Sequence, residues 1–180
     1  VLQTRGRTES DTRNLEDAIA AYDAAATGIA ANSDAWASLN NNRGNALVTL
    51  ASRRPGREIL MQGIASLLAA LEVRRVETRP LAHAITQNNL GNAYAQLAQL
   101  TAKPDDFKRA ASAYAAAISG FPVERFPQYW AAAQNNRAFN LMLHGEQASS
   151  PALLTESIAG FDAALTIRLK ASAPLYWSQS

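Results

Sequence analysis

The stretch that decides the fold is NNLGNAY, residues 88–94, which has close copies at equal distances on either side. The upstream copy is NNRGNAL, residues 41–47, and the downstream copy is NNRAFNL, residues 135–141. Successive copies begin 47 positions apart. A fixed interval of this size is typical of repeat proteins, in which one supersecondary unit stacks on the next.

Two further series of residues support the same interval. One recurs at steps of 47 and consists of Trp36, His83, Trp130 and Trp177. The other, with steps of 45, 47 and 47, consists of Tyr22, Leu67, Tyr114 and Phe161. Around the second series, apolar and small residues recur at offsets of three and four, which describes one stripe of a helix. Each repeat is therefore predicted to be a helix–turn–helix that buries its stripe by stacking on its neighbours.

The turn residues predict where the helices begin. The first helix of each repeat, which carries the Asn-Asn pair, is predicted at residues 35–52, 80–101 and 127–145. The second helix is predicted to start near residues with capping or proline signals, namely Asp11, Gly56, Asp105 and Ser150. Leu2 falls at the repeat position of Leu47, so the chain is predicted to begin inside an earlier first helix. Trp177 falls at the position of Trp130, so another first helix is predicted to open there.

These patterns predict a single all-α domain over residues 1–180, folded as a right-handed α-solenoid of antiparallel helix pairs. The repeat boundaries are placed at 1–33 for a partial repeat, then 34–79, 80–126 and 127–173, with 174–180 opening a truncated repeat. Neither end carries the polar capping helix of a complete array. We therefore expect the chain to be a segment of a longer protein, or one trimmed by processing.

Composition narrows the possible functions. Seventeen basic and fifteen acidic residues leave a formal charge of +2, too small an excess to indicate nucleic acid or a membrane surface. The absence of cysteine excludes disulfides, thiolate metal sites and a cysteine nucleophile. No apolar run approaches the roughly 18 residues of a membrane span. We expect a cytoplasmic protein with no membrane partner.

No catalytic or cofactor motif is found. The sequence has neither a Gly-x-Ser-x-Gly elbow nor a glycine-rich phosphate loop. His83 and His144 are far apart in register, and neither has a carboxylate or second histidine at metal-binding spacing. The chain is therefore not expected to be an enzyme, to bind a metal or to carry a cofactor.

NLGNAY, residues 89–94, resembles the first helix of a tetratricopeptide repeat, and the spacing of Ala110, Tyr114 and Ala117 resembles its second helix. The familiar repeat has 34 residues, and this one is thirteen longer. The longer form is similar to repeats of bacterial multidomain proteins, some of which carry a caspase-like (CHAT) peptidase domain. Residues 126–136 and 165–177 carry that similarity. The resemblance implies a solenoid whose first helices line a concave, partner-binding groove.

Asparagines supply the candidate binding residues. Asn41 and Asn45 are four positions apart and share a helix face, as do Asn88 and Asn92. Asn135 starts the same pair before Phe139 interrupts it. The predicted partner-binding residues of the concave face are Asn41, Asn45, Asn88, Asn92, Asn135, Phe139 and Met142. Carboxamides carry donors and acceptors, so a row of them can bind the backbone of an extended peptide with little regard to its sequence.

A structural role between helices suits these same asparagines equally. For Asn42, Asn89 and Asn136 the structural role is favoured, as inter-helix hydrogen bonds. Arg43 and Arg137 stand where Leu90 packs in the middle repeat. Either their stems are buried with the guanidinium at the edge, or these repeats pack less tightly. The tryptophan series is expected to pack across the turn between repeats.

The predicted function is recognition of a protein or extended peptide. No lysine or arginine stands on the concave face, which disfavours a clamp for carboxylates. One alternative is a regulatory or sensor segment of a larger bacterial enzyme, for example a caspase-like peptidase. RNA binding is a lesser alternative that rests on arginine-rich turns at residues 53–57 and 74–79. A homo-oligomer formed through exposed solenoid ends is a further option.

Overall fold

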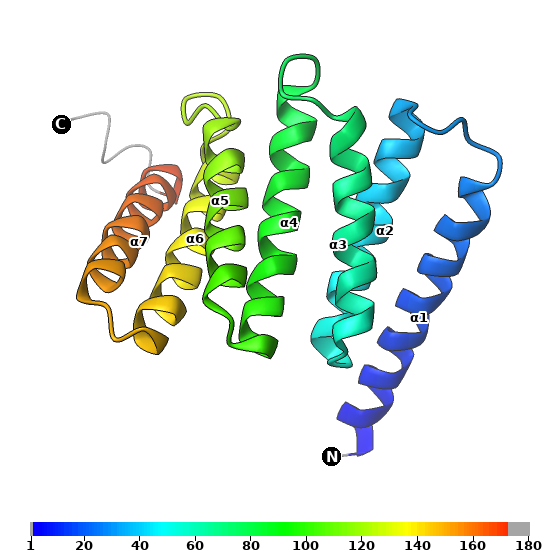
Figure 1. Cartoon of the computed structure of the whole chain (residues 1–180), viewed down its shortest axis with the longest axis horizontal. Helices are drawn as coiled ribbons and strands as arrows, with labels where there is room; N and C mark the ends of the chain where they lie inside the picture. The colour runs from blue at the N-terminus through cyan, green and yellow to red at the C-terminus, as the bar shows by residue number, and fades with distance from the viewer. Residues whose placement is uncertain (1, 173–180) are drawn as a thin grey trace.

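The computed structural model describes the backbone of residues 2–172 and the side chains of residues 12–169. Within these ranges the secondary structure is entirely helical: α1 (Leu2–Ala26), α2 (Asp34–Arg53), α3 (Arg57–Val73), α4 (Pro80–Thr101), α5 (Pro104–Ser119), α6 (Pro127–Gln147) and α7 (Pro151–Ser172). Figure 1 shows the helices side by side in chain order, with α1 and α7 at opposite ends of the row. The described residues form the all-α solenoid of antiparallel helix pairs that the sequence predicts.

The arrangement of the helices defines an inner side of the solenoid. Each helix packs on its neighbours in the chain, and α4 also approaches α2 and α6. In the part of the chain that the structure describes, the second helices of successive repeats do not contact each other: α3 makes no contact with α5, and α5 makes none with α7. The row is therefore tighter on the side of α2, α4 and α6, which makes this the concave side.

Proline punctuates most of the helix starts. Pro80, Pro104, Pro127 and Pro151 each occupy the first position of a helix, where the missing N–H has no intrahelical partner to lose. The first helices of the repeats begin and end within two residues of their predicted bounds. The regular spacing of these prolines and of the apolar stripes explains this agreement.

The predicted turn near Asp11 is wrong. α1 is one continuous helix of 25 residues from Leu2 to Ala26, not the end of one helix followed by the start of another. The other turns between a first and a second helix contain or precede a proline, at residues 55, 104 and 151, whereas residues 2–11 contain none. Nothing there stops the helix from continuing. The predicted helix opening at Trp177 lies outside the described residues.

The apolar stripes meet in a core that is most complete in the middle of the row. Leu67 and Tyr114, at equivalent positions of α3 and α5, are buried. Tyr22 and Phe161, at the same position in α1 and α7, are half-buried. Both end helices have a described neighbour on one side only, so burial depends on stacking between repeats.

In each pair, the two helices come closest to each other at a small residue. A Cβ built on Gly91 of α4 would lie 2.6 Å from the ring of Tyr114 in α5, and one on Gly44 of α2 would lie 2.7 Å from Leu67. In the third pair the equivalent position is Ala138, and the space comes instead from Gly160 of α7, where a Cβ would lie 2.9 Å from that of Ala138. The missing methyl group lets the two backbones approach.

Arg43 and Arg137 are half-buried, and their guanidinium groups form ion pairs with neighbouring second helices. Arg43 Nε donates to Asp23 Oδ1 of α1 at 2.6 Å, and its Nη1 donates to Ser66 Oγ of α3 at 2.7 Å. Arg137 is likewise half-buried and pairs with Glu156 of α7. The half-buried stems agree with the first of the two alternatives for these arginines, whereas Arg137 Nε is buried without a hydrogen-bond partner among the described residues and so departs from it.

We predict that Gly91→Ala destabilises the fold by about 1–3 kcal/mol, because the added methyl group has to displace the Tyr114 ring from a packed interface. Urea unfolding followed by far-UV circular dichroism measures the change. Gly28→Ala is the matched control, because a Cβ at Gly28 meets nothing within 4 Å. Equal stability of the two variants would contradict the close-approach argument.

Candidate functional site

A hollow of about 290 Å³ lies on the concave side, between α2, α4 and α6. We call it the inner groove. Its lining residues are Asn45, Val48, Thr49, Ser52, Asn92, Ala95, Gln96, Gln99, Tyr114, Asn136 and Phe139. None of them carries a charge at neutral pH, which agrees with the predicted uncharged surface.

Helical and repeat periodicity together bring these side chains to one face. On α4, Asn92, Gln96 and Gln99 stand at offsets of four and seven, which is one stripe of a helix. Asn45 and Phe139 lie 47 positions before and after Asn92, so they occupy the same register on α2 and α6. The stacking of repeats therefore aligns the three positions across the groove.

Three amide side chains of the inner groove are open to a ligand. Within the described residues, the amide groups of Asn45, Gln96 and Gln99 take part in no hydrogen bond with the protein. Asn45 and Gln99 are exposed and Gln96 is half-buried. Each offers a carbonyl acceptor and two N–H donors to whatever occupies the groove.

Other amides of this face are used to hold the helices together. Asn92 Oδ1 accepts from Tyr114 Oη at 2.9 Å and from Asn136 Nδ2 at 3.3 Å. Asn136 Nδ2 also contacts Asn88 Oδ1 at 3.5 Å. These bonds connect α4 with α5 and α6, and they confirm the inter-helix role predicted for Asn136.

The prediction that Asn41 faces the groove is wrong. Its side chain is only 7% exposed, and its Oδ1 accepts from Asn89 Nδ2 at 3.2 Å and from Thr86 Oγ1 at 3.0 Å. α2 and α4 meet at this level, so the face that is open at Asn45 is covered one turn earlier. The bond from Asn89 confirms its predicted inter-helix role. Asn42 is exposed, and among the described residues its side chain bonds only to its neighbour Asn41, so the predicted bond between helices is not formed there.

The remaining predicted residues divide between the groove and its surroundings. Phe139 is 45% exposed and contributes to the lining. Asn88, Asn135 and Met142 are half-buried and do not line the hollow, so a binding role for them stays a prediction. Gln96 and Gln99 were not among the predicted residues, although their offsets of four and seven from Asn92 place them on the same helix face.

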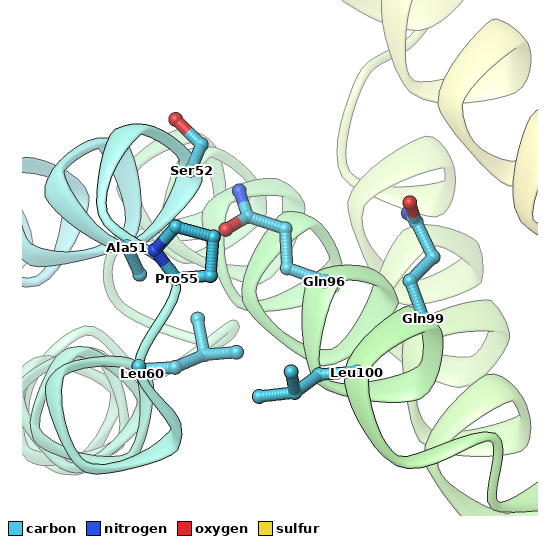
Figure 2. Close-up of a pocket in the computed structure, with 8 residues that line it drawn as sticks. Ala51, Ser52, Pro55, Leu60, Gln96, Gln99 and Leu100 are labelled. Carbon is cyan, nitrogen blue, oxygen red and sulfur yellow. The ribbon is translucent and has the colours of Figure 1, made fainter.

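A second hollow, of about 350 Å³, opens beside the inner groove. We call it the side pocket, and its lining residues are Ala51, Ser52, Pro55, Gly56, Leu60, Gln96, Gln99 and Leu100. Three of these also line the inner groove, namely Ser52, Gln96 and Gln99. Figure 2 shows Leu60 and Leu100 pointing toward each other, while Gln96 extends toward Pro55 and Gln99 points away.

A third hollow, of about 550 Å³, lies on the turns at the other end of the helices and shares no lining residue with the inner groove. His83 lines it, and the ring Nδ1 is 2.7 Å from the carbonyl oxygen of Arg74, across the turn between α3 and α4.

Trp130, the next residue of the tryptophan series, packs at the turn between α5 and α6 on a buried cluster that includes Phe121. These contacts confirm the predicted packing of His83 and Trp130, while Trp177 lies outside the described residues.

Several arginines of the basic turns are engaged within the protein. Arg54 pairs with Glu16 at 2.8 Å, and Arg79 pairs with Asp34. The Arg74 guanidinium donates to Thr86 Oγ1 at 2.8 Å and to Ser38 Oγ at 3.0 Å. Burial lowers the pKa of Arg74, and the negative charge of Asp34 partly opposes that shift. The two ion pairs offset part of the charge that these turns would present to RNA.

The described residues contain no group of three or more histidine, aspartate or glutamate side chains placed to hold a metal ion. Over the same part of the chain, no helix has both the length and the apolar character needed to cross a membrane.

Comparison with known proteins yields no match to a protein-family model, to a curated protein or to a solved structure. The resemblance of residues 89–94 to the tetratricopeptide pattern stays a prediction. Interpretation of the inner groove therefore rests on the geometry of this chain.

We predict that Asn41→Ala lowers the free energy of unfolding by about 1–3 kcal/mol, because it removes the acceptor of the half-buried Asn89 amide and leaves space at a buried position between α2 and α4. Asn45→Ala is the matched control and is expected to change stability by less than about 0.5 kcal/mol, as is usual for an exposed side chain. Urea unfolding of both variants measures the difference. Equal losses would contradict the division between structural and open amides.

Burial raises the pKa of the Tyr114 hydroxyl above its ordinary value. In the unfolded chain this hydroxyl has a pKa of about 10. As the pH rises above that value, the unfolded state therefore loses the proton before the folded state does. The contribution of Tyr114 to stability is thus complete below about pH 10 and is lost as pH rises toward the folded-state pKa. We predict that unfolding free energies measured across this range fall more steeply for the wild type than for Tyr114→Phe. Parallel curves would contradict this effect of burial.

Proposed function

We propose that this chain is a tetratricopeptide-like scaffold that binds an extended segment of a partner protein in the inner groove. The observation that carries the proposal is the set of open amides on Asn45, Gln96 and Gln99, which lie on two neighbouring helices beside Phe139. The surrounding amides are held in hydrogen bonds, so the surface is preorganised for a ligand.

The chemistry of these groups fits the backbone of an extended peptide. Such a backbone presents one N–H and one C=O per residue, and a carboxamide can pair with either. The absence of charged residues from the lining favours an uncharged segment, because a buried charge without a partner is costly. An acidic peptide or a nucleic acid would find no neutralising group among the residues of the inner groove.

Phe139 gives the groove an apolar contact at one side. It stands in the register of Asn45 and Asn92, so the third repeat presents a ring where the first two present amides. Covering its exposed surface stabilises a complex by roughly 25 cal/mol per Å² of apolar area removed from water. Phe139 therefore provides selectivity that backbone bonds alone lack.

The test compares the triple variant Asn45→Ala/Gln96→Ala/Gln99→Ala with the wild type in a pull-down from a cell lysate analysed by mass spectrometry, followed by titration of the captured partner. Loss of three hydrogen bonds at about 0.5–1.5 kcal/mol each corresponds to weakening of at least about tenfold.

The control for this test is Gln62→Ala/Gln128→Ala, which removes two exposed amides outside the inner groove. Circular dichroism should show the same helix content in all three proteins. Equal affinity of the triple variant and the wild type for every partner would refute the proposed function.

A further inference from the structure

We infer that the side pocket receives one uncharged apolar side chain of the peptide held in the inner groove. This inference rests on the proposed function and adds the class of residue that the ligand carries. It also assigns a role to Leu60 and Leu100, which the amide row does not use.

The side pocket is continuous with the inner groove. Ser52, Gln96 and Gln99 line both hollows, so a backbone bonded to the amides of Gln96 and Gln99 lies at the entrance of the pocket. Side chains of an extended peptide alternate between two sides of the backbone. A peptide that bonds to Gln96 and Gln99 therefore directs one side chain toward the pocket while its neighbours face away.

The walls of the pocket are suited to an apolar group. Leu60 is 2% exposed and forms its buried floor, whereas Leu100 is 48% exposed. Figure 2 shows these two side chains facing each other below Pro55. Its lining contains no charged residue, so a lysine, arginine or glutamate side chain would lose hydration without gaining a partner.

In the next repeat, the position equivalent to the side pocket is closed by side chains. The residues 47 positions after Leu60 and Leu100 are Phe107 and Gln147. Gln147 Nε2 donates to the carbonyl oxygen of Ala102 at 2.5 Å, and Phe107 stacks on His144 with ring centroids 5.0 Å apart. A hydrogen bond therefore bridges the place where the side pocket is open, and two rings pack beneath it.

Leu100 is also unusual within its own register. The equivalent residues of the flanking repeats are the polar Arg53 and Gln147. An exposed leucine beside a concave opening differs from one scattered on a flat surface, because a ligand can cover it on several sides. At about 350 Å³ the pocket has room for one side chain of the size of leucine, methionine or phenylalanine.

The experiment uses fluorescein-labelled peptides of alanine, serine, threonine and asparagine, in which one guest residue is alanine, leucine or glutamate at each position in turn. Fluorescence anisotropy measures their affinity for the full chain. At one position, leucine should bind about tenfold more tightly than alanine, and glutamate should bind no better than alanine.

Two variants test whether the preference arises in the side pocket. Leu100→Gln introduces the residue of the closed repeat and should abolish the leucine preference, so that the leucine and alanine peptides bind this variant equally. Leu68→Gln is the matched control, because Leu68 is an exposed leucine of α3 outside both hollows, and the preference should survive there. Leu60→Phe, which fills the pocket from its floor, should abolish the preference independently.

The outcomes separate this inference from the proposed function. If the alanine peptide binds but leucine gives no gain at any position, or if the gain survives in Leu100→Gln, the side pocket is not the specificity site and the peptide groove still stands. If no peptide binds the wild type, the proposed function fails and the inference fails with it. Unfolding curves of each variant establish that a lost preference does not come from a lost fold.

Discussion

The close approach of paired helices at one small residue is the contact on which the rest of this structure depends. Gly91 lets Tyr114 pack directly on the backbone of α4, and in the third pair Gly160 of α7 makes the corresponding space for Ala138. The exchange of glycine from one helix to the other shows that the constraint acts on the pair, not on one position. Tight pairs bring successive first helices together and so create the concave side.

Asparagines on the concave side have two roles: some form hydrogen bonds between helices, and others remain open to a ligand. The surroundings of each side chain determine its role. The bond from Asn89 to Asn41 is repeated one unit later by Asn136 and Asn88, each time between residues 48 positions apart. Amides in these bonds stabilise the stacking of repeats, so they are not available to bind a ligand. Amides one turn further along, such as that of Asn45, make no hydrogen bond with the described residues and remain open to a ligand.

The candidate site was only partly predictable for this reason. Placing Asn45, Asn92 and Phe139 on one face required only the helical and repeat periods, and the structure does bring these three residues to the inner groove. Asn41 satisfies the same periods but is buried against α4. Gln96 and Gln99 follow the stripe of Asn92, yet they lie outside the recurring motif on which the prediction was based.

The sequence by itself determined the all-α repeat architecture, where most helices start and the uncharged character of the groove, because these follow from local signals that recur every 47 residues. Tertiary structure alone decided which carboxamides are open, that α1 is a single helix, and that a pocket opens beside Leu100 but is bridged beside Gln147. Periodicity specifies the direction in which a side chain points. Whether that direction leads to solvent or to another helix depends on how closely the neighbouring repeats pack.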